Sequence, residues 1–239
     1  MKADRVLRFA NLYFRGLRRE DLLRDDGQLK LIVTVNAEII VQANGDPILA
    51  EIINRNWATL DGHWPHLLAR RSTGRNEIEK ISGSDFIYDL CGMARERRMR
   101  VFLLGASPEV NRAACEKLRA THGIEIEGYA PPVMSFPFPG QVDGDIMARI
   151  SAFRPHILVV GFGAPKQEYW ADAHLPGLAK AGTRWVLAAG GTLDFVAGAL
   201  RRAPVAVQRA GLESLWRFAL QPRTRFRRLL RALRFLQYA

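Results

Sequence analysis

Three times along the chain, a short apolar run ends in glycine and is followed by the start of a helix. The three segments are residues 101–109 (VFLLGASPE), 159–170 (VVGFGAPKQEYW) and 185–194 (WVLAAGGTLD). A strand that leads through a glycine turn into a helix is typical of a parallel sheet, whose strands need helical crossovers. In such sheets ligands bind outside the carboxyl ends of the strands, where we expect these turns to cluster.

The second of these turns, at Gly161 and Gly163, is suited to binding a phosphate. Glycine adopts positive φ and allows close approach to the backbone, Pro165 suits the first position of a helix, and the free N–H groups there attract anions. An ordinary strand-to-helix turn is the alternative, because Gly-x-Gly turns are common. Gln167 and Glu168 would then be surface residues of a helix start.

Strand and helix patterns alternate along most of the chain. We expect strands at 30–36, 57–60, 100–105, 124–129, 156–161 and 184–189. We expect helices at 46–54, 82–99, 108–121, 144–152, 165–174, 192–199, 209–220 and 222–237. This alternation predicts an α/β protein, a Rossmann-like doubly wound parallel sheet with a C-terminal basic helical appendage.

The net charge of +11 comes from the two ends of the chain. Residues 1–24 carry seven basic and three acidic side chains, and residues 200–239 carry ten arginines and one glutamate. We therefore predict a basic N-terminal helical segment (1–24), a Rossmann-like domain (25–203) and a basic amphipathic appendage (204–239).

Packing on the core is the common fate of an amphipathic helix such as the one expected at 222–237. Docking on an anionic membrane surface is favoured here, because no acidic residue follows Glu213 and such segments gain about 1 kcal/mol per basic residue near anionic lipids. The chain shows neither an apolar run of transmembrane length nor a signal-peptide core, so we expect a cytoplasmic protein.

No pattern typical of a metal site is present. Cys91 and Cys115 are too far apart for a CxxC motif, and the histidines form no metal motif, so we expect buried thiols. Asp143-Gly144-Asp145 resembles the DxD with which many sugar transferases hold a metal. Its position before the expected helix favours an N-cap with a dipole-compensating acid.

Polar side chains follow two of the expected strands. Asp61 ends the strand at 57–60 and could take a proton from a hydroxyl group, although an Asp before Gly62 also closes turns. Thr34 and Asn36 point to the same side at the end of the strand at 30–36. They could bind a ligand, or serve as a strand terminus and a helix cap.

Taken together, these segments resemble the WecG/TagA/CpsF family of bacterial glycosyltransferases (glycosyltransferase family 26). The resemblance runs from about Leu31 to Arg228. It is carried by six segments in order: TVN at 34–36, LDG at 60–62, ISGSD at 81–85, GFGAPKQEYW at 161–170, GG at 190–191 with DF at 194–195, and RAP at 202–204 with QRAGLE at 208–213.

The resemblance implies transfer of a sugar from a UDP donor to an undecaprenyl-diphosphate-linked sugar at the inner face of the cytoplasmic membrane. It implies inversion at the anomeric carbon, with no metal and no cofactor. Asp61 matches the proposed general base, Thr34 and Asn36 match the floor of the pocket, and Gln167 matches a nucleotide-sugar contact. The turns that match the family place Gly161, Gly163, Gly190 and Gly191 among the expected substrate-binding residues.

In this family, the appendage docks on the membrane and supplies arginines to the diphosphate. Arg217 and Arg227 match two of them, whereas a third falls on Thr224, so Arg223 or Arg225 would have to substitute. Lys80 stands where the family usually has a catalytic arginine. A lysine keeps the charge but loses the bidentate fork of arginine.

The sugar is inferred from a similarity of residues 57–65 and 200–234 to the exopolysaccharide β-1,4-glucosyltransferase branch, which favours UDP-glucose. UDP-N-acetylmannosamine, or its uronic acid, is the alternative donor. A basic nucleic-acid-binding module is the rival from another class, but it gives no reason for three phosphate-type turns, so we expect no nucleic acid partner. A nicotinamide-dependent enzyme would need a third glycine where Lys166 stands. The oligomeric state stays open, homo-oligomers included.

Overall fold

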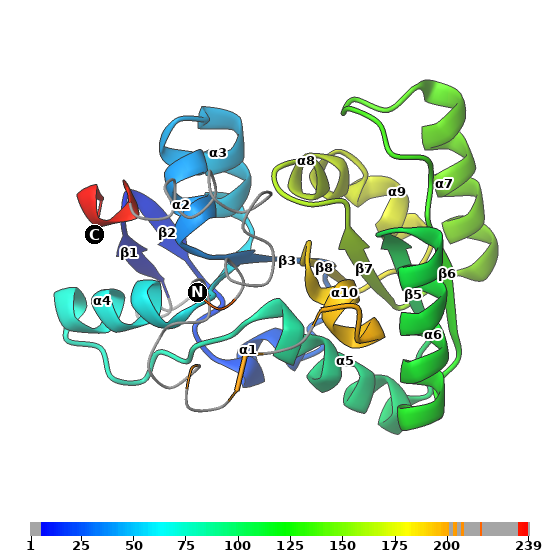
Figure 1. Cartoon of the computed structure of the whole chain (residues 1–239), viewed down its shortest axis with the longest axis horizontal. Coiled ribbons are helices and arrows are strands. Elements are labelled where there is room, and N and C mark those ends of the chain that lie inside the picture. Colours follow the sequence, from blue (N-terminus) through cyan, green and yellow to red (C-terminus); the bar gives the residue numbers. More distant parts are fainter. Residues whose placement is uncertain (1–5, 201–202, 205–206, 208–215, 217–233, 239) are drawn as a thin grey trace. The chain divides into compact units, whose positions relative to one another are not determined.

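The computed structural model describes residues 6–200, 203–204, 207, 216 and 234–238, and the structural statements below refer to these residues. The chain forms two compact units (Figure 1). Unit 1 comprises residues 1–22, 34–82 and 201–239, and unit 2 comprises residues 23–33 and 83–200. The boundaries predicted at 24/25 and 203/204 remain predictions.

A six-stranded sheet has the order β4-β3-β8-β7-β5-β6. Its strands are β3 (Lys30–Val35), β4 (Trp57–Leu60), β5 (Val101–Gly105), β6 (Ile126–Tyr129), β7 (Ile157–Gly161) and β8 (Trp185–Ala188). The pairs β3·β8, β8·β7, β7·β5 and β5·β6 are parallel. Side chains along β3, β5 and β8 are buried at every position, as expected for strands covered on both faces. The predicted doubly wound fold is therefore confirmed.

Helices cover both faces of the sheet of unit 2 (Figure 1). One face carries α5 (Gly83–Arg97), α6 (Pro108–His122) and α10 (Thr192–Ala197). The other carries α7 (Gly140–Phe153), α8 (Lys166–Ala173) and α9 (Leu175–Lys180). The limits of α6 follow from local chemistry: Ser107 Oγ accepts the Val110 N–H at 3.3 Å, and Gly123 ends the helix with φ +64°.

Unit 1 contains an antiparallel hairpin and several helices. The hairpin consists of β1 (Leu7–Phe9) and β2 (Leu12–Phe14). The helices are α1 (Arg19–Leu23), whose last residue belongs to unit 2, α2 (Ala37–Asn44), α3 (Pro47–Arg55), α4 (His63–Thr73) and the 3-10 turn η2 (Arg234–Gln237). η2 packs against α2, and Phe235 is only 3% exposed. Of the helices predicted at 209–220 and 222–237, nearly all residues lie outside the described part of the chain.

The predicted N-terminal helical segment (1–24) is wrong for residues 7–14, which form the hairpin. Ala10 and Asn11 have φ of +50° and +63°, and two successive residues of positive φ make the tight turn that suits paired strands. Leu7, Phe9, Leu12 and Phe14 are all buried on one side of the hairpin. Helix is found only over the five residues of α1.

Candidate functional site

The three glycine turns of unit 2 lie side by side, as the sequence predicted. They follow β5, β7 and β8, which are neighbours in the sheet, with Gly105 paired to Gly161 in the register. A Cβ on Gly105 would lie 2.9 Å from the carbonyl of Gly161, and a Cβ on Gly190 would lie 3.1 Å from the Cα of Gly163. Both distances are shorter than an ordinary contact, so glycine is required where the backbones meet.

The turn between β7 and α8 is held closed by Gln167. Gly163 has φ +82°, and its N–H donates to Gln167 Oε1 at 3.1 Å. The Gln167 N–H donates in return to the Gly163 carbonyl at 3.2 Å. Pro165 is the residue just before α8, one position earlier than predicted. The turn and the first residues of the helix are therefore linked in both directions.

Gln167 and Glu168 are buried, with 2% and 0% of their surface exposed. The alternative interpretation of both as surface residues is therefore wrong. Gln167 Nε2 donates to Glu168 Oε1 at 2.8 Å, while Glu168 Oε2 has no hydrogen-bond partner among the described residues. Burial raises the pKa of Glu168 to about 7, although its hydrogen bonds to Gln167 and to its own backbone act in the opposite direction.

The buried Glu168 should make folding stability depend on pH. In the folded protein the Glu168 carboxyl group keeps its proton up to about pH 7, whereas in the unfolded chain it loses the proton near pH 4.5. The free energy of unfolding therefore falls as pH rises between these values. Between pH 5.5 and 8.5 we expect a loss of about 2 kcal/mol in the free energy of unfolding. Denaturant titrations of the wild type and Glu168→Gln will measure it. An equal pH dependence in both proteins would contradict the assignment.

Aromatic side chains surround the same turn. The Phe162 ring lies edge-on to Phe138 at 5.1 Å and to the buried Trp170 at 5.7 Å. Lys166 Nζ donates to the Met134 carbonyl at 3.2 Å. The proline-rich segment between β6 and α7 is therefore held against the Gly161–Gly163 turn by ring contacts and by one hydrogen bond.

The prediction that Asp143 caps a helix is wrong, because α7 begins at Gly140 and Asp143 lies within its first turn. Asp143 Oδ1 accepts from Trp170 Nε1 at 2.7 Å, and Oδ2 lies 2.8 Å from His174 Nε2. Asp145 instead pairs with Arg149 at 3.1 Å. The two carboxylates of the DxD-like segment thus have different partners, and Asp143 joins α7 to α8.

The described residues contain no group of three or more His, Cys, Asp or Glu side chains placed to hold a metal ion. Cys91 and Cys115 are both buried, as predicted. Burial raises the pKa of Cys91 to about 12 and that of Cys115 to about 11. Both thiols are therefore protonated at neutral pH.

The polar residues predicted at strand ends come together within unit 1. The Asp61 N–H donates to the Val35 carbonyl at 2.9 Å, and the Ile81 N–H donates to the Leu60 carbonyl at 3.0 Å. The first bond places the backbone of Asp61 beside the end of β3, which includes Thr34 and is followed by Asn36. The second brings the segment that holds Lys80 next to the end of β4.

Asn36 also has a structural role. Its Oδ1 accepts the Ile39 N–H at 3.1 Å and caps α2, which was the structural alternative for this residue. The side-chain N–H₂ group is a donor that this bond does not use. Thr34 is buried, whereas Asn36, Asp61 and Lys80 are half-buried.

The sequence-predicted site residues therefore fall into separate sets. Unit 1 carries Thr34, Asn36, Asp61 and Lys80, and unit 2 carries the glycine turns and Gln167. Arg217, Arg223, Arg225 and Arg227 lie outside the described residues.

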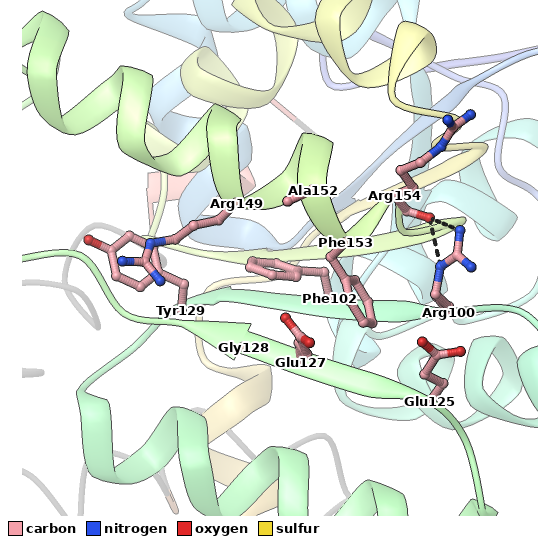
Figure 2. Close-up of a pocket in the computed structure, with 10 residues that line it drawn as sticks. All are labelled: Arg100, Phe102, Glu125, Glu127, Gly128, Tyr129, Arg149, Ala152, Phe153 and Arg154. Carbon is pink, nitrogen blue, oxygen red and sulfur yellow. Dashed lines mark hydrogen bonds between the residues drawn. The ribbon is translucent and has the colours of Figure 1, made fainter.

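A different hollow of about 580 Å³ runs along the edge strand β6 (Figure 2). Arg149 places its guanidinium 4.2 Å from the centre of the Tyr129 ring, and Arg100 donates to the Arg154 carbonyl at 2.9 and 3.1 Å. None of the sequence-predicted site residues lines this hollow. The hollow therefore adds nothing to the candidate residues, which are the glycine turns and Gln167 in unit 2 and, separately, Thr34, Asn36, Asp61 and Lys80 in unit 1.

No helix in the described residues is long and apolar enough to cross a membrane. The family model described as "Glycosyl transferase WecG/TagA/CpsF family" matches residues 8–239. The match includes the hairpin of unit 1, the glycine turns of unit 2 and the basic C-terminal stretch. The chain belongs to the WecG/TagA/CpsF family of glycosyltransferases.

Proposed function

We propose that this protein transfers glucose from UDP-glucose to an undecaprenyl-diphosphate-linked sugar during exopolysaccharide assembly, with inversion at the anomeric carbon. Membership of the family implies a glycosyltransferase of cell-surface glycan synthesis, with a nucleotide-sugar donor and a lipid-linked acceptor. The observation that carries the proposal is the position of Asp61. Its backbone N–H bonds to the Val35 carbonyl, so residue 61 lies beside the chain segment that holds Thr34 and Asn36.

In the proposed reaction Asp61 is the general base. Its carboxylate takes the proton from the acceptor hydroxyl while the hydroxyl oxygen bonds to the anomeric carbon of the donor sugar. The bond from that carbon to the UDP oxygen breaks, and its electron pair leaves with the diphosphate. Attack from the face opposite to UDP inverts the anomeric configuration.

The departing diphosphate needs positive charge, which this proposal assigns to the protein. Backbone N–H groups at the glycine turns and at the start of α8, other than those of Gly163 and Gln167, which bond within the turn, supply one part. Arg217, Arg227 and either Arg223 or Arg225 supply another, and Lys80 contributes a point charge near Asp61. No divalent ion takes part in this scheme.

Membrane docking would bring the enzyme to its lipid-linked acceptor. The stretch after residue 199 contains ten arginines and one acidic residue, a balance that favours binding to an anionic leaflet. If these arginines complete the site when the stretch docks, transfer is slow in solution and fast at the membrane.

Radiolabelled UDP-glucose and UDP-N-acetylmannosamine, each incubated with vesicles that hold glucosyl-diphosphate-undecaprenol or its amino-sugar counterpart, will test the proposal. We expect transfer of glucose, unchanged by a chelator. Transfer of the amino sugar alone would correct the donor, and loss of transfer with the chelator would contradict the metal-free scheme.

A further inference from the structure

Glu168 has no role in the chemistry proposed above, yet it is the most deeply buried acid among the described residues. It lies in the first turn of α8, directly after Gln167. Burying a carboxyl group costs free energy unless its hydrogen bonds compensate. Among the described residues, the one hydrogen bond that joins its carboxyl group to another side chain is the 2.8 Å bond that Oε1 accepts from Gln167 Nε2, so we looked for the function of Glu168 in Gln167.

The Gln167 amide can face the Gly163 turn in two ways that are nearly identical in shape. With its oxygen toward the turn, it accepts the Gly163 N–H, as observed at 3.1 Å. With its N–H₂ group toward the turn, two donors would face each other and repel. A carboxyl oxygen of Glu168 accepts from the N–H₂ group only, so Glu168 selects the first orientation.

The third glycine turn lies close to the same amide oxygen. Gln167 Oε1 lies 3.1 Å from the position that a Cβ on Gly190 would occupy. The oxygen that bonds to Gly163 thus also lies where a side chain on residue 190 would collide with it. The two turns are those at which the donor diphosphate is proposed to bind.

We propose that Glu168 is a positioning residue for the donor site, because it orients the Gln167 amide that bonds to Gly163 and lies close to Gly190. This inference rests on the proposed function for the identity of the ligand, a nucleoside diphosphate. The effect of Glu168 on the Gly163 hydrogen bond does not depend on that ligand. Glu168 does not touch the diphosphate in this assignment. It acts through Gln167.

The chemistry of the bond suggests a matched pair of variants. Glu168→Gln keeps a side-chain oxygen that accepts from Gln167 Nε2, whereas Glu168→Met keeps the length of the side chain and has only a weakly accepting sulfur. At pH 8 the loss of a buried carboxylate offsets the loss of its hydrogen bond, so we expect both variants to be about as stable as the wild type. If Glu168 served only the stability of the fold, neither variant would change the exchange of the Gly163 amide or the affinity for UDP.

Two measurements at pH 8 test the proposal. Hydrogen exchange of the Gly163 amide, followed by NMR, is expected to accelerate about tenfold in Glu168→Met, and the Kd for UDP to rise about tenfold, the equivalent of one hydrogen bond. Glu168→Gln should stay within twofold of the wild type in both. If Glu168→Met does not fold, Glu168→Leu takes its place.

The possible results distinguish the positioning role of Glu168 from the binding of the donor. Equal exchange of Gly163 and equal UDP affinity in the Met and Gln variants would overturn the positioning role. Faster exchange in the Met variant with unchanged UDP affinity would overturn the link to the donor. A wild type that binds no UDP and transfers no sugar would overturn the proposed function, and Gly163 exchange would then decide the local role by itself.

Discussion

Replacing Asp61 by asparagine is expected to lower the rate of sugar transfer by about 10² to 10⁴-fold, the usual contribution of a general base. Asparagine has nearly the same shape but cannot take the proton of the acceptor hydroxyl. The backbone N–H of residue 61 still bonds to the Val35 carbonyl, so the end of β3 should be undisturbed. Single-turnover transfer of labelled sugar measures the rate.

Asp145→Asn is the matched control for this experiment. Asp145 is also a carboxylate beside a basic side chain, but it pairs with Arg149 on the exposed surface of α7. We expect this control to transfer sugar at the wild-type rate and both variants to keep the wild-type Kd for UDP. Near-normal transfer by Asp61→Asn would show that another group is the base.

Neutralising Arg223, Arg225, Arg227 and Arg228 with glutamine is expected to weaken binding to anionic vesicles by about 10² to 10³-fold. Each basic residue contributes roughly 1 kcal/mol near an anionic leaflet, and four are removed. Sedimentation with vesicles that contain anionic lipid gives the partition coefficient, and neutral vesicles give the baseline. The wild-type interaction should also weaken as salt is added.

Substitution is a better test than truncation after Pro204. Truncation would also remove Phe235, which is buried against unit 1, and a loss of binding could then reflect unfolding. The control variant removes the same charge from another surface. In it, glutamine replaces four exposed arginines of unit 2: Arg95, Arg97, Arg98 and Arg112. Unchanged vesicle binding of the C-terminal variant would move the membrane contact to another surface.

The strands and the glycine turns could be predicted because their signals are local. An apolar run that ends in glycine needs no knowledge of distant contacts, and the parallel pairing of β5, β7 and β8 follows from the helices between them. Thr34 and Asp61 could be placed at strand ends for the same reason. Their closeness depends on the pairing of β4 with β3, continued by the bond from the Asp61 N–H to the Val35 carbonyl, and no local pattern specifies this pairing.

The errors have physical causes. Leu7, Phe9, Leu12 and Phe14 lie on strands of three residues each, too short for a period of two to be distinguished from a helical period. The turn between them uses Ala10 and Asn11 without a glycine.

The burial of Glu168 could not be predicted either. A glutamate in the first turn of a helix is usually exposed, and only the contacts of the folded chain show that the Gln167 amide needs it as an acceptor.

The basic stretch between Ala203 and Phe235 is anchored at both ends, because each of these residues is buried and both belong to unit 1. If the arginines of this stretch act on the donor diphosphate as proposed, the encounter takes place within one chain, at an effective concentration of order millimolar. At such a concentration, the number of positive charges near the diphosphate affects its neutralisation more than the exact position of each arginine does. The loss of one matching arginine at Thr224 is therefore tolerable in a stretch where Arg223 and Arg225 are its immediate neighbours.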